Sequence, residues 1–262
     1  MDENFDIESN VYKYYVKGIA QFAFPIFLAF YFIIYDLNLV LLLSGIVASF
    51  LIANVAYTNT HYINSHQLIK VNSKILRYVL NYISTVYVFT PPASWSFYHV
   101  LHHRYVDTEL DPISPTHIGF FKVASFFNHK LDTIKKIPPY QQKKIVVGVK
   151  HLLSDPAAMF FEKYFLWLIL LHTLALMYID IELLVYFYVI PQIYIMCTEV
   201  IAFWAHSEKW GGNAPKNNSS NATNNYYLWW LVPFEALHAD HHNGRDRYNP
   251  SLRYLKKLFI DK

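Results

Sequence analysis

The sequence predicts an all-α integral membrane protein, with four transmembrane helices in two hairpins and a helical cap outside the membrane. Three observations support this fold class. Hydrophobic residues make up 54% of the 262-residue chain and charged residues only 16%, whereas an ordinary soluble domain carries about 25% charged residues. Four long hydrophobic runs occur in two pairs. The segments outside these runs mix lysine, histidine and proline with apolar residues.

The first hairpin is expected from two uncharged runs that a tight corner separates. Residues 18–35 contain no charged side chain and are long enough to cross the hydrocarbon core as a helix, which takes about 20 residues. After the corner at residues 36–38, residues 39–57 form the second uncharged run. We therefore expect two antiparallel membrane-spanning helices.

The second hairpin is expected at residues 164–181 and 183–205, with its corner at residues 180–182. Residues 58–157 lie between the two hairpins and are too mixed in polarity to enter the bilayer. Within them, residues 79–91 are apolar but too short to span. They predict a buried or interfacial helix.

The lysine and arginine residues predict the orientation in the membrane. None of the 22 lies in the two short corners, so the positive-inside rule places both termini and the cap, residues 58–157 and 206–262, in the cytoplasm. The membrane would be the endoplasmic reticulum in a eukaryote or the inner membrane in a bacterium. We expect a single domain over residues 1–262. The net charge of +3 is too small to argue for nucleic acid as a partner.

Eight of the 13 histidines lie in three short clusters, all within the predicted cap. The clusters are His61 and His66; His99, His102 and His103; and His238, His241 and His242. On a helix, residues three and four apart share one face. A single histidine is most often a hydrogen-bonded surface or core residue, but each buried ring has two nitrogens that need partners. A metal ion is the natural partner for three clusters together.

The number and type of ligands predict a histidine-rich site for two metal ions in the cap. Imidazole ligands without cysteine suit iron, zinc, copper or nickel and disfavour magnesium and calcium. His206, just after the fourth predicted span, is a ninth candidate, and nine ligands are enough for two ions. His61 and His66 are five residues apart, about 140° around an ideal α-helix. We therefore expect these two to serve different metals.

Acidic residues close to the clusters are candidates to accept the second ring N–H of a ligating histidine. They are Asp107, Glu109, Asp111, Glu235 and Asp240. A solvated or capping acid is the alternative for each. A dimetal histidine site can be hydrolytic, with a metal-bound water as nucleophile, or oxidative. Its place beside two membrane hairpins favours a long apolar substrate.

The order of the clusters is HxxxxH from His61, HxxHH from His99 and HxxHH from His238, with the lone His206 before the last. Residues 102–112 read HHRYVDTELDP, Trp95 stands four residues before His99, and Glu235 precedes the third cluster. This pattern resembles the membrane fatty-acid desaturases, and most closely their acyl-CoA, delta-9 (stearoyl-CoA) type. The resemblance covers roughly residues 20–250.

The resemblance implies oxygen-dependent insertion of a double bond into a long-chain fatty acyl substrate, in fatty acid biosynthesis, with acyl-CoA as the expected substrate. It implies a di-iron centre (two Fe²⁺ ions) and O₂ as co-substrate. The implied ligands are His61, His66, His99, His102, His103, His206, His238, His241 and His242. An external electron donor, a b-type cytochrome or a ferredoxin, is also implied, because the chain has one cysteine and few residues after position 250.

The sequence departs from the family pattern near the clusters. Tyr62 replaces a usual arginine, Ala202 replaces an asparagine that holds a metal-bound water, and Phe97 and Tyr98 replace an arginine and an acid. The acyl group could therefore be carried on a protein or a lipid instead. A di-iron hydroxylase on the same scaffold is the nearest alternative, although it usually has HxxxH as its first cluster. A membrane metal transporter is a further alternative, for which only His172 lies inside a span.

Overall fold

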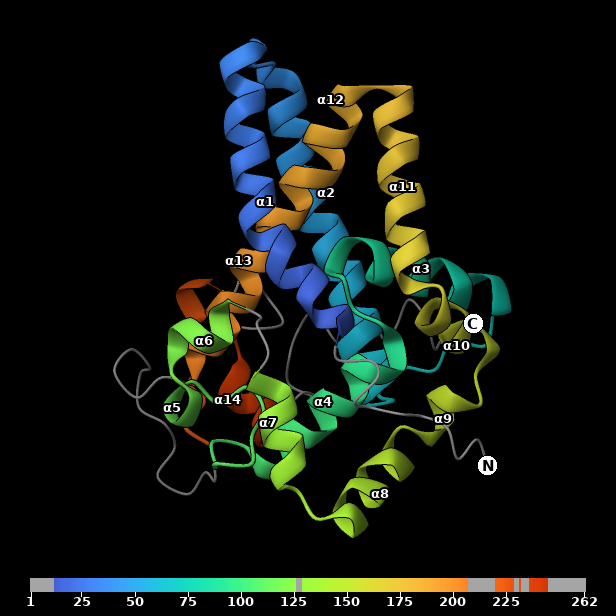
Figure 1. The fold of residues 1–262 in the computed structure, drawn as a ribbon, viewed down its shortest axis with the longest axis vertical. Coiled ribbons are helices and arrows are strands. Elements are labelled where there is room, and N and C mark those ends of the chain that lie inside the picture. Colours follow the sequence, from blue (N-terminus) through green and yellow to red (C-terminus); the bar gives the residue numbers. More distant parts are fainter. Residues whose placement is uncertain (1–11, 126–128, 207–219, 229–230, 232–235, 245–262) are drawn as a thin grey trace.

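A computed structural model describes residues 12–125, 129–206, 220–228, 231 and 236–244. Within these ranges the regular structure is helical, and strand pairing is limited to an isolated bridge between Asn224 and Leu237. Figure 1 shows long helices that stand together above a layer of shorter ones. The all-α class is thereby confirmed for the described part of the chain.

The first predicted hairpin consists of α1 (Tyr12–Ile34) and α2 (Leu39–Tyr57). Asn38 begins α2, because its side chain accepts a hydrogen bond from the backbone N–H of Leu41. Apolar side chains on the outside of both helices are largely exposed, among them Ile33 at 78% and Val40 at 73%. Such a surface suits the hydrocarbon core of a bilayer.

The second hairpin is less regular than predicted. The short helix α10 (Pro156–Lys163) meets α11 (Phe165–Ile179) at a bend of 72°. The returning segment is one helical stretch built from α12 (Ile181–Leu184), the π-helix η3 (Val185–Val189) and α13 (Ile190–Ala205).

The described residues thus contain three helices long and apolar enough to cross a membrane, or up to four if the bent pair is one span. The helix α11 has 15 residues, about 22 Å at the α-helical rise, against a hydrocarbon core of about 30 Å. The protein is an integral membrane protein by the length and composition of these helices. The four-span topology, the single-domain boundaries and the cytoplasmic orientation stay predictions.

Helix α2 approaches the backbone of η3 closely at Gly45. Gly45, Ser49 and Ala53 are buried and lie four residues apart on α2, a spacing that lets the backbones of membrane helices come close. A Cβ atom at Gly45 would overlap the backbone carbonyl oxygen of Tyr186. Glycine is therefore required at this contact for steric reasons.

We expect Gly45→Ala to destabilise the protein by about 1–3 kcal/mol, because the added methyl group must push α2 and η3 apart. In a helix without this contact, the same change gains up to about 1 kcal/mol. Thermal unfolding in detergent measures the difference. The control is Gly148→Ala, where the new Cβ would meet Val100 Cγ1 at an ordinary 3.5 Å. A Gly45→Ala variant as stable as the wild type would contradict the packing described.

The cap consists of shorter helices beneath the long ones (Figure 1). Helix α3 (Lys74–Val88) contains most of the predicted short apolar helix and begins earlier, where the Ser73 side chain accepts the N–H of Leu76. Helix α4 (Pro92–Tyr105) follows it. The remaining cap helices are α5 (Pro115–Ile118), α6 (Phe120–Ala124), α7 (His129–Lys136), α8 (Pro139–Gly148), α9 (Lys150–Leu153) and α14 (His238–His242).

A buried carboxylate fixes the start of α4 against the membrane helices. Glu162 accepts hydrogen bonds from the backbone N–H groups of Ala93 (2.9 Å) and Ser94 (3.1 Å), which the first turn of a helix leaves without partners. The Lys13 ammonium on α1 donates to the same carboxylate at 2.6 Å. Helix α4, which carries the second histidine cluster, is therefore held to α1 and α10.

Candidate metal centre

The first histidine cluster lies where α2 continues as the π-helix η2 (Thr58–Ser65). The backbone N–H of His66 donates to the carbonyl of His61 at 3.0 Å, the five-residue hydrogen bond of a π-helix. The two ring centroids are 5.0 Å apart. The prediction that His61 and His66 serve different metals is wrong, because it assumed an α-helix. A π-helical turn brings residues five apart to the same side.

The histidines of α4 and of α14 are divided between two groups. On α4, His99 and His103 are four residues apart and face one group of histidines, while His102 faces a second group. On α14 the pair four residues apart, His238 and His242, belongs to the second group, and His241 crosses to the first. The clusters on α4 and α14 therefore each contribute to both groups, although the members of each share one broad helix face.

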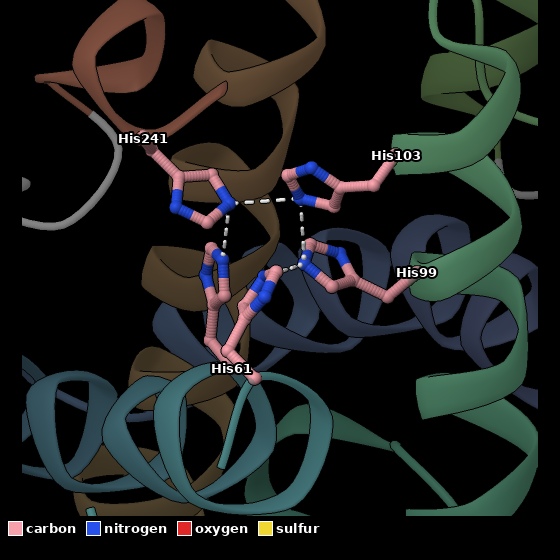
Figure 2. Close-up of side chains that lie close together, drawn as sticks. His61, His99, His103 and His241 are labelled. Atoms are coloured by element: carbon pink, nitrogen blue, oxygen red, sulfur yellow. Dashed lines mark hydrogen bonds between the residues drawn. The ribbon is translucent and has the colours of Figure 1, made fainter. Parts of the chain in front are cut away.

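All nine predicted ligands come together in these two groups. The first group is His61, His66, His99, His103 and His241, and the second is His102, His206, His238 and His242. Within each group the ligand nitrogens lie within 4.8 Å of one another. Figure 2 shows His61 from η2, His99 and His103 from α4, and His241 from α14, with their ring nitrogens pointing toward one another. Each group is an arrangement that can hold one metal ion.

Two rings of the second group, those of His102 and His206, present an Nε2 lone pair to its centre. The Nδ1–H of His102 donates to Asp111 at 2.9 Å, and that of His206 donates to Asp107 at 3.1 Å. A neutral imidazole that donates through Nδ1 has a lone pair on Nε2. The Nε2 atom of His206 nevertheless lies 2.8 Å from that of His238. A proton or a metal ion between the two nitrogens satisfies both of them, so the donors fit a metal ion.

Burial favours the neutral form of several of these histidines. It lowers the pKa of His99, His103 and His241 well below the ordinary value, and the neighbouring histidines lower it further. For His206, burial lowers the pKa to about 4, although the hydrogen bond to Asp107 opposes the shift. Near neutral pH these four rings are thus in the form that binds metals.

Two of the five candidate acids orient ligand rings. Asp111 is fully buried and also accepts the backbone N–H groups of Asp107 (2.9 Å) and Ile113 (3.0 Å). Burial opposes ionisation of Asp107, but hydrogen bonds from His206 and Asn221 outweigh it and hold its pKa below the ordinary value. Both are therefore carboxylates that fix the ring orientation.

The other three candidate acids differ from these two. Glu109 is exposed. Asp240 lies on α14, where its backbone N–H donates to Asn224. Glu235 lies outside the described residues.

We expect Asp111→Asn to weaken metal binding by about 10- to 100-fold, because His102 loses the carboxylate that fixes its tautomer and orientation. Chelator competition on the purified protein measures this change. Glu109→Gln, two residues away and exposed, is the matched control and should bind metal as the wild type does. Equal affinities for all three proteins would show that Asp111 does not support the site.

A cavity of about 80 Å³ lies against both histidine groups. Its apolar and aromatic wall residues are Tyr57, Phe89, Trp95, Tyr98, Ile113, Ala202 and Phe203. The Trp95 ring stacks on His99 with 4.8 Å between centroids. Ala202 lines the cavity next to the second group. Its side chain is a methyl group, whereas the family pattern has an asparagine at this position.

Two charged residues, Lys17 and Glu199, also line this cavity, and the sequence analysis missed both. A signal was available: Glu199 is the only charged residue in the predicted span 183–205. A charge inside a membrane helix is a functional candidate by default. Lys17 directly precedes the first predicted span.

His172 belongs to neither histidine group. Its Nδ1 atom lies 2.7 Å from the hydroxyl of Tyr82, which joins α11 to α3. This contact is a hydrogen bond between helices, and in the described part of the chain no further metal group lies along the spans.

The helices and the two histidine groups define an integral membrane protein with a candidate dimetal site. In sequence, the chain is similar to icosanoyl-CoA 5-desaturase of Limnanthes douglasii, at 28% identity over 183 residues, which cover 64% of this chain and 46% of that protein. It is also similar to acyl-CoA C20 Delta5-desaturase of Anemone leveillei, at 27% identity over 178 residues, covering 64% and 52%. The chain spans about half the length of these curated relatives. No protein-family model matches the chain.

Proposed function

We propose that this protein is a membrane fatty acyl desaturase that uses O₂ to introduce a double bond into a long-chain acyl-CoA. The observation that carries the proposal is the convergence of nine histidines, in groups of five and four, on a largely apolar cavity at the end of membrane helices. The two relatives named above are acyl-CoA desaturases, which supports the same reaction class.

In this proposal each histidine group holds one iron ion, and the two irons supply oxygen activation and hydrogen abstraction when bound. The protein supplies position and environment. Asp107 and Asp111 keep ligand rings oriented through Nδ1. Trp95, Phe89 and Phe203 form apolar wall that can hold an acyl chain beside the irons and exclude water. Electrons come from an external donor, a b-type cytochrome or a ferredoxin.

The position of the double bond is the finer part of the proposal. The histidine motifs resemble the delta-9 type, whereas the two relatives are named for the fifth position. We propose delta-9-like insertion on the motifs of this chain, with the fifth position as the alternative that the relatives suggest.

A di-iron hydroxylase remains the second candidate because it would use the same metals and cavity. The five-residue separation of His61 and His66 favours desaturation. Across η2 that separation places both rings in the five-histidine group. The HxxxH first cluster that is typical of hydroxylases separates its two histidines by only four residues.

Expression in a desaturase-deficient yeast, followed by gas chromatography of its fatty acids, tests the reaction and its position together. We expect a new monounsaturated acid that the empty vector does not produce. A hydroxylated acid would establish the alternative. Protein in the membrane fraction without any new fatty acid would contradict both candidates.

A further inference from the structure

The cavity beside the histidines contains a buried ion pair between two membrane helices. The Lys17 ammonium on α1 lies 2.5 Å from the Glu199 carboxylate on α13 and donates to the carbonyl of Val88 at 2.8 Å. The two side chains are 5% and 10% exposed. Both residues lie within segments long and apolar enough to span a membrane, Tyr15–Ile34 and Ile181–Ala205.

Stability alone does not explain this pair. A buried ion pair loses hydration on both charges, and apolar residues of similar volume often replace it without loss of stability. Charged residues in membrane helices usually face a cavity and mark the path of a substrate. Lys17 and Glu199 satisfy this description, because they line the same cavity as His102, His206 and His238.

The pair gives the cavity wall a hydrogen-bonding group. A plain hydrocarbon chain packed against it would add no hydrogen bond, whereas a polar group of the substrate could bind there. A site built to hydrogen-bond a polar group rejects analogues that lack the group far more strongly than an apolar pocket rejects a missing methylene. An acyl-CoA has one such group near its chain, the thioester carbonyl, which accepts hydrogen bonds. The ammonium of Lys17 is the donor of the pair.

We propose that the Lys17–Glu199 pair binds the thioester carbonyl of the acyl-CoA. This contact determines which carbons of the chain, counted from the carbonyl, lie beside the histidines. This inference rests on the proposed function. Glu199 precedes His206 by seven residues, about 10 Å along a helix. An extended chain covers about 1.2 Å per bond, one third of the span of a residue. A chain that runs along α13 from the pair to His206 would cover this length with about eight or nine carbon–carbon bonds, which fits a delta-9-like position.

A binding experiment with two ligands and two proteins tests the proposal without turnover. The ligands are stearoyl-CoA and its thioether analogue, which lacks the carbonyl oxygen. The proteins are the iron-loaded full chain and its Lys17→Met/Glu199→Leu variant, kept anaerobic and without an electron donor. The wild type should bind the thioester at least about 10-fold more tightly, the effect of one hydrogen bond to a charged group. The variant should bind both ligands equally.

Gln21→Leu is the matched control, because Gln21 lies one turn further along α1 and donates to the carbonyl of Ala124 instead of lining the cavity. It should keep the preference of the wild type. Equal binding of both ligands by the wild type overturns the proposal, even if the double variant does not fold. An unchanged preference in a folded double variant also overturns it.

The products give an independent test of the distance. With acyl-CoA substrates of 16, 18 and 20 carbons, the double bond should stay at one position counted from the carbonyl. A position that moves with the methyl end would overturn the inference and leave the proposed function intact. Absence of any unsaturated product, with the thioester preference retained, would instead contradict the proposed function.

Discussion

Replacing His103 by alanine should abolish formation of unsaturated product while leaving the protein in the membrane. The Nε2 atom of His103 lies 3.1 Å from that of His99 and 2.8 Å from that of His241, so its ring completes the first histidine group from α4. Loss of a direct ligand should exceed the 10- to 100-fold effect typical of its outer partners. We expect activity to fall by more than about 100-fold.

Fatty acid analysis of the yeast strain, with immunodetection of the protein in the membrane fraction, measures this result. His117→Gln is the control. His117 is exposed and outside both groups, and glutamine can still donate a hydrogen bond to the backbone carbonyl of Asp107, as His117 does. Retained desaturation in His103→Ala would remove His103 from the site.

The ligand set was predictable because it depends on local spacing. Residues four apart on a helix face the same way whatever surrounds the helix, and this rule alone pairs His99 with His103 and His238 with His242. The hydrophobic runs were predictable for a similar reason, since the length needed to cross a bilayer is a property of the segment itself.

The assignment of His61 and His66 was not predictable from spacing, because it depends on helix type. All eight residues of η2 are buried, and tertiary contacts on every side hold the wider turn. Two of them join neighbouring elements: Asn59 donates to Asn81 on α3, and Ser65 donates to Ser96 on α4. The sequence shows these polar residues but not their partners.

Likewise, closeness in sequence could not separate the acids. Asp111 and Glu109 are two residues apart, yet one is fully buried against His102 and the other is exposed. The turn that precedes both residues contributes to this difference. Asp107 adopts a positive φ of 56°, which turns the chain after α4 so that Asp111 folds back onto the ring. The Lys17–Glu199 pair joins residues that are 182 positions apart, beyond any local rule.

Protein purified anaerobically from iron-replete cells should contain close to two irons per chain. The physical reason is that the nine histidines form two separate groups, each with its ligand nitrogens within 4.8 Å, and each group has enough imidazoles for one ion. A structural zinc site needs only four ligands, so it would use one group and leave the five imidazoles of the other without a metal. Elemental analysis of metal per chain measures the stoichiometry.

Single variants in each group test which group holds which iron, because each metal ion needs most of the ligands of its own group. His103→Ala should lower the iron content toward one per chain through the first group, and His242→Ala should do so through the second. The double variant should retain almost none. A wild type with a single zinc and no iron would contradict oxygen chemistry at this site. Loss of both irons on either single change would contradict independent metal binding by the two groups.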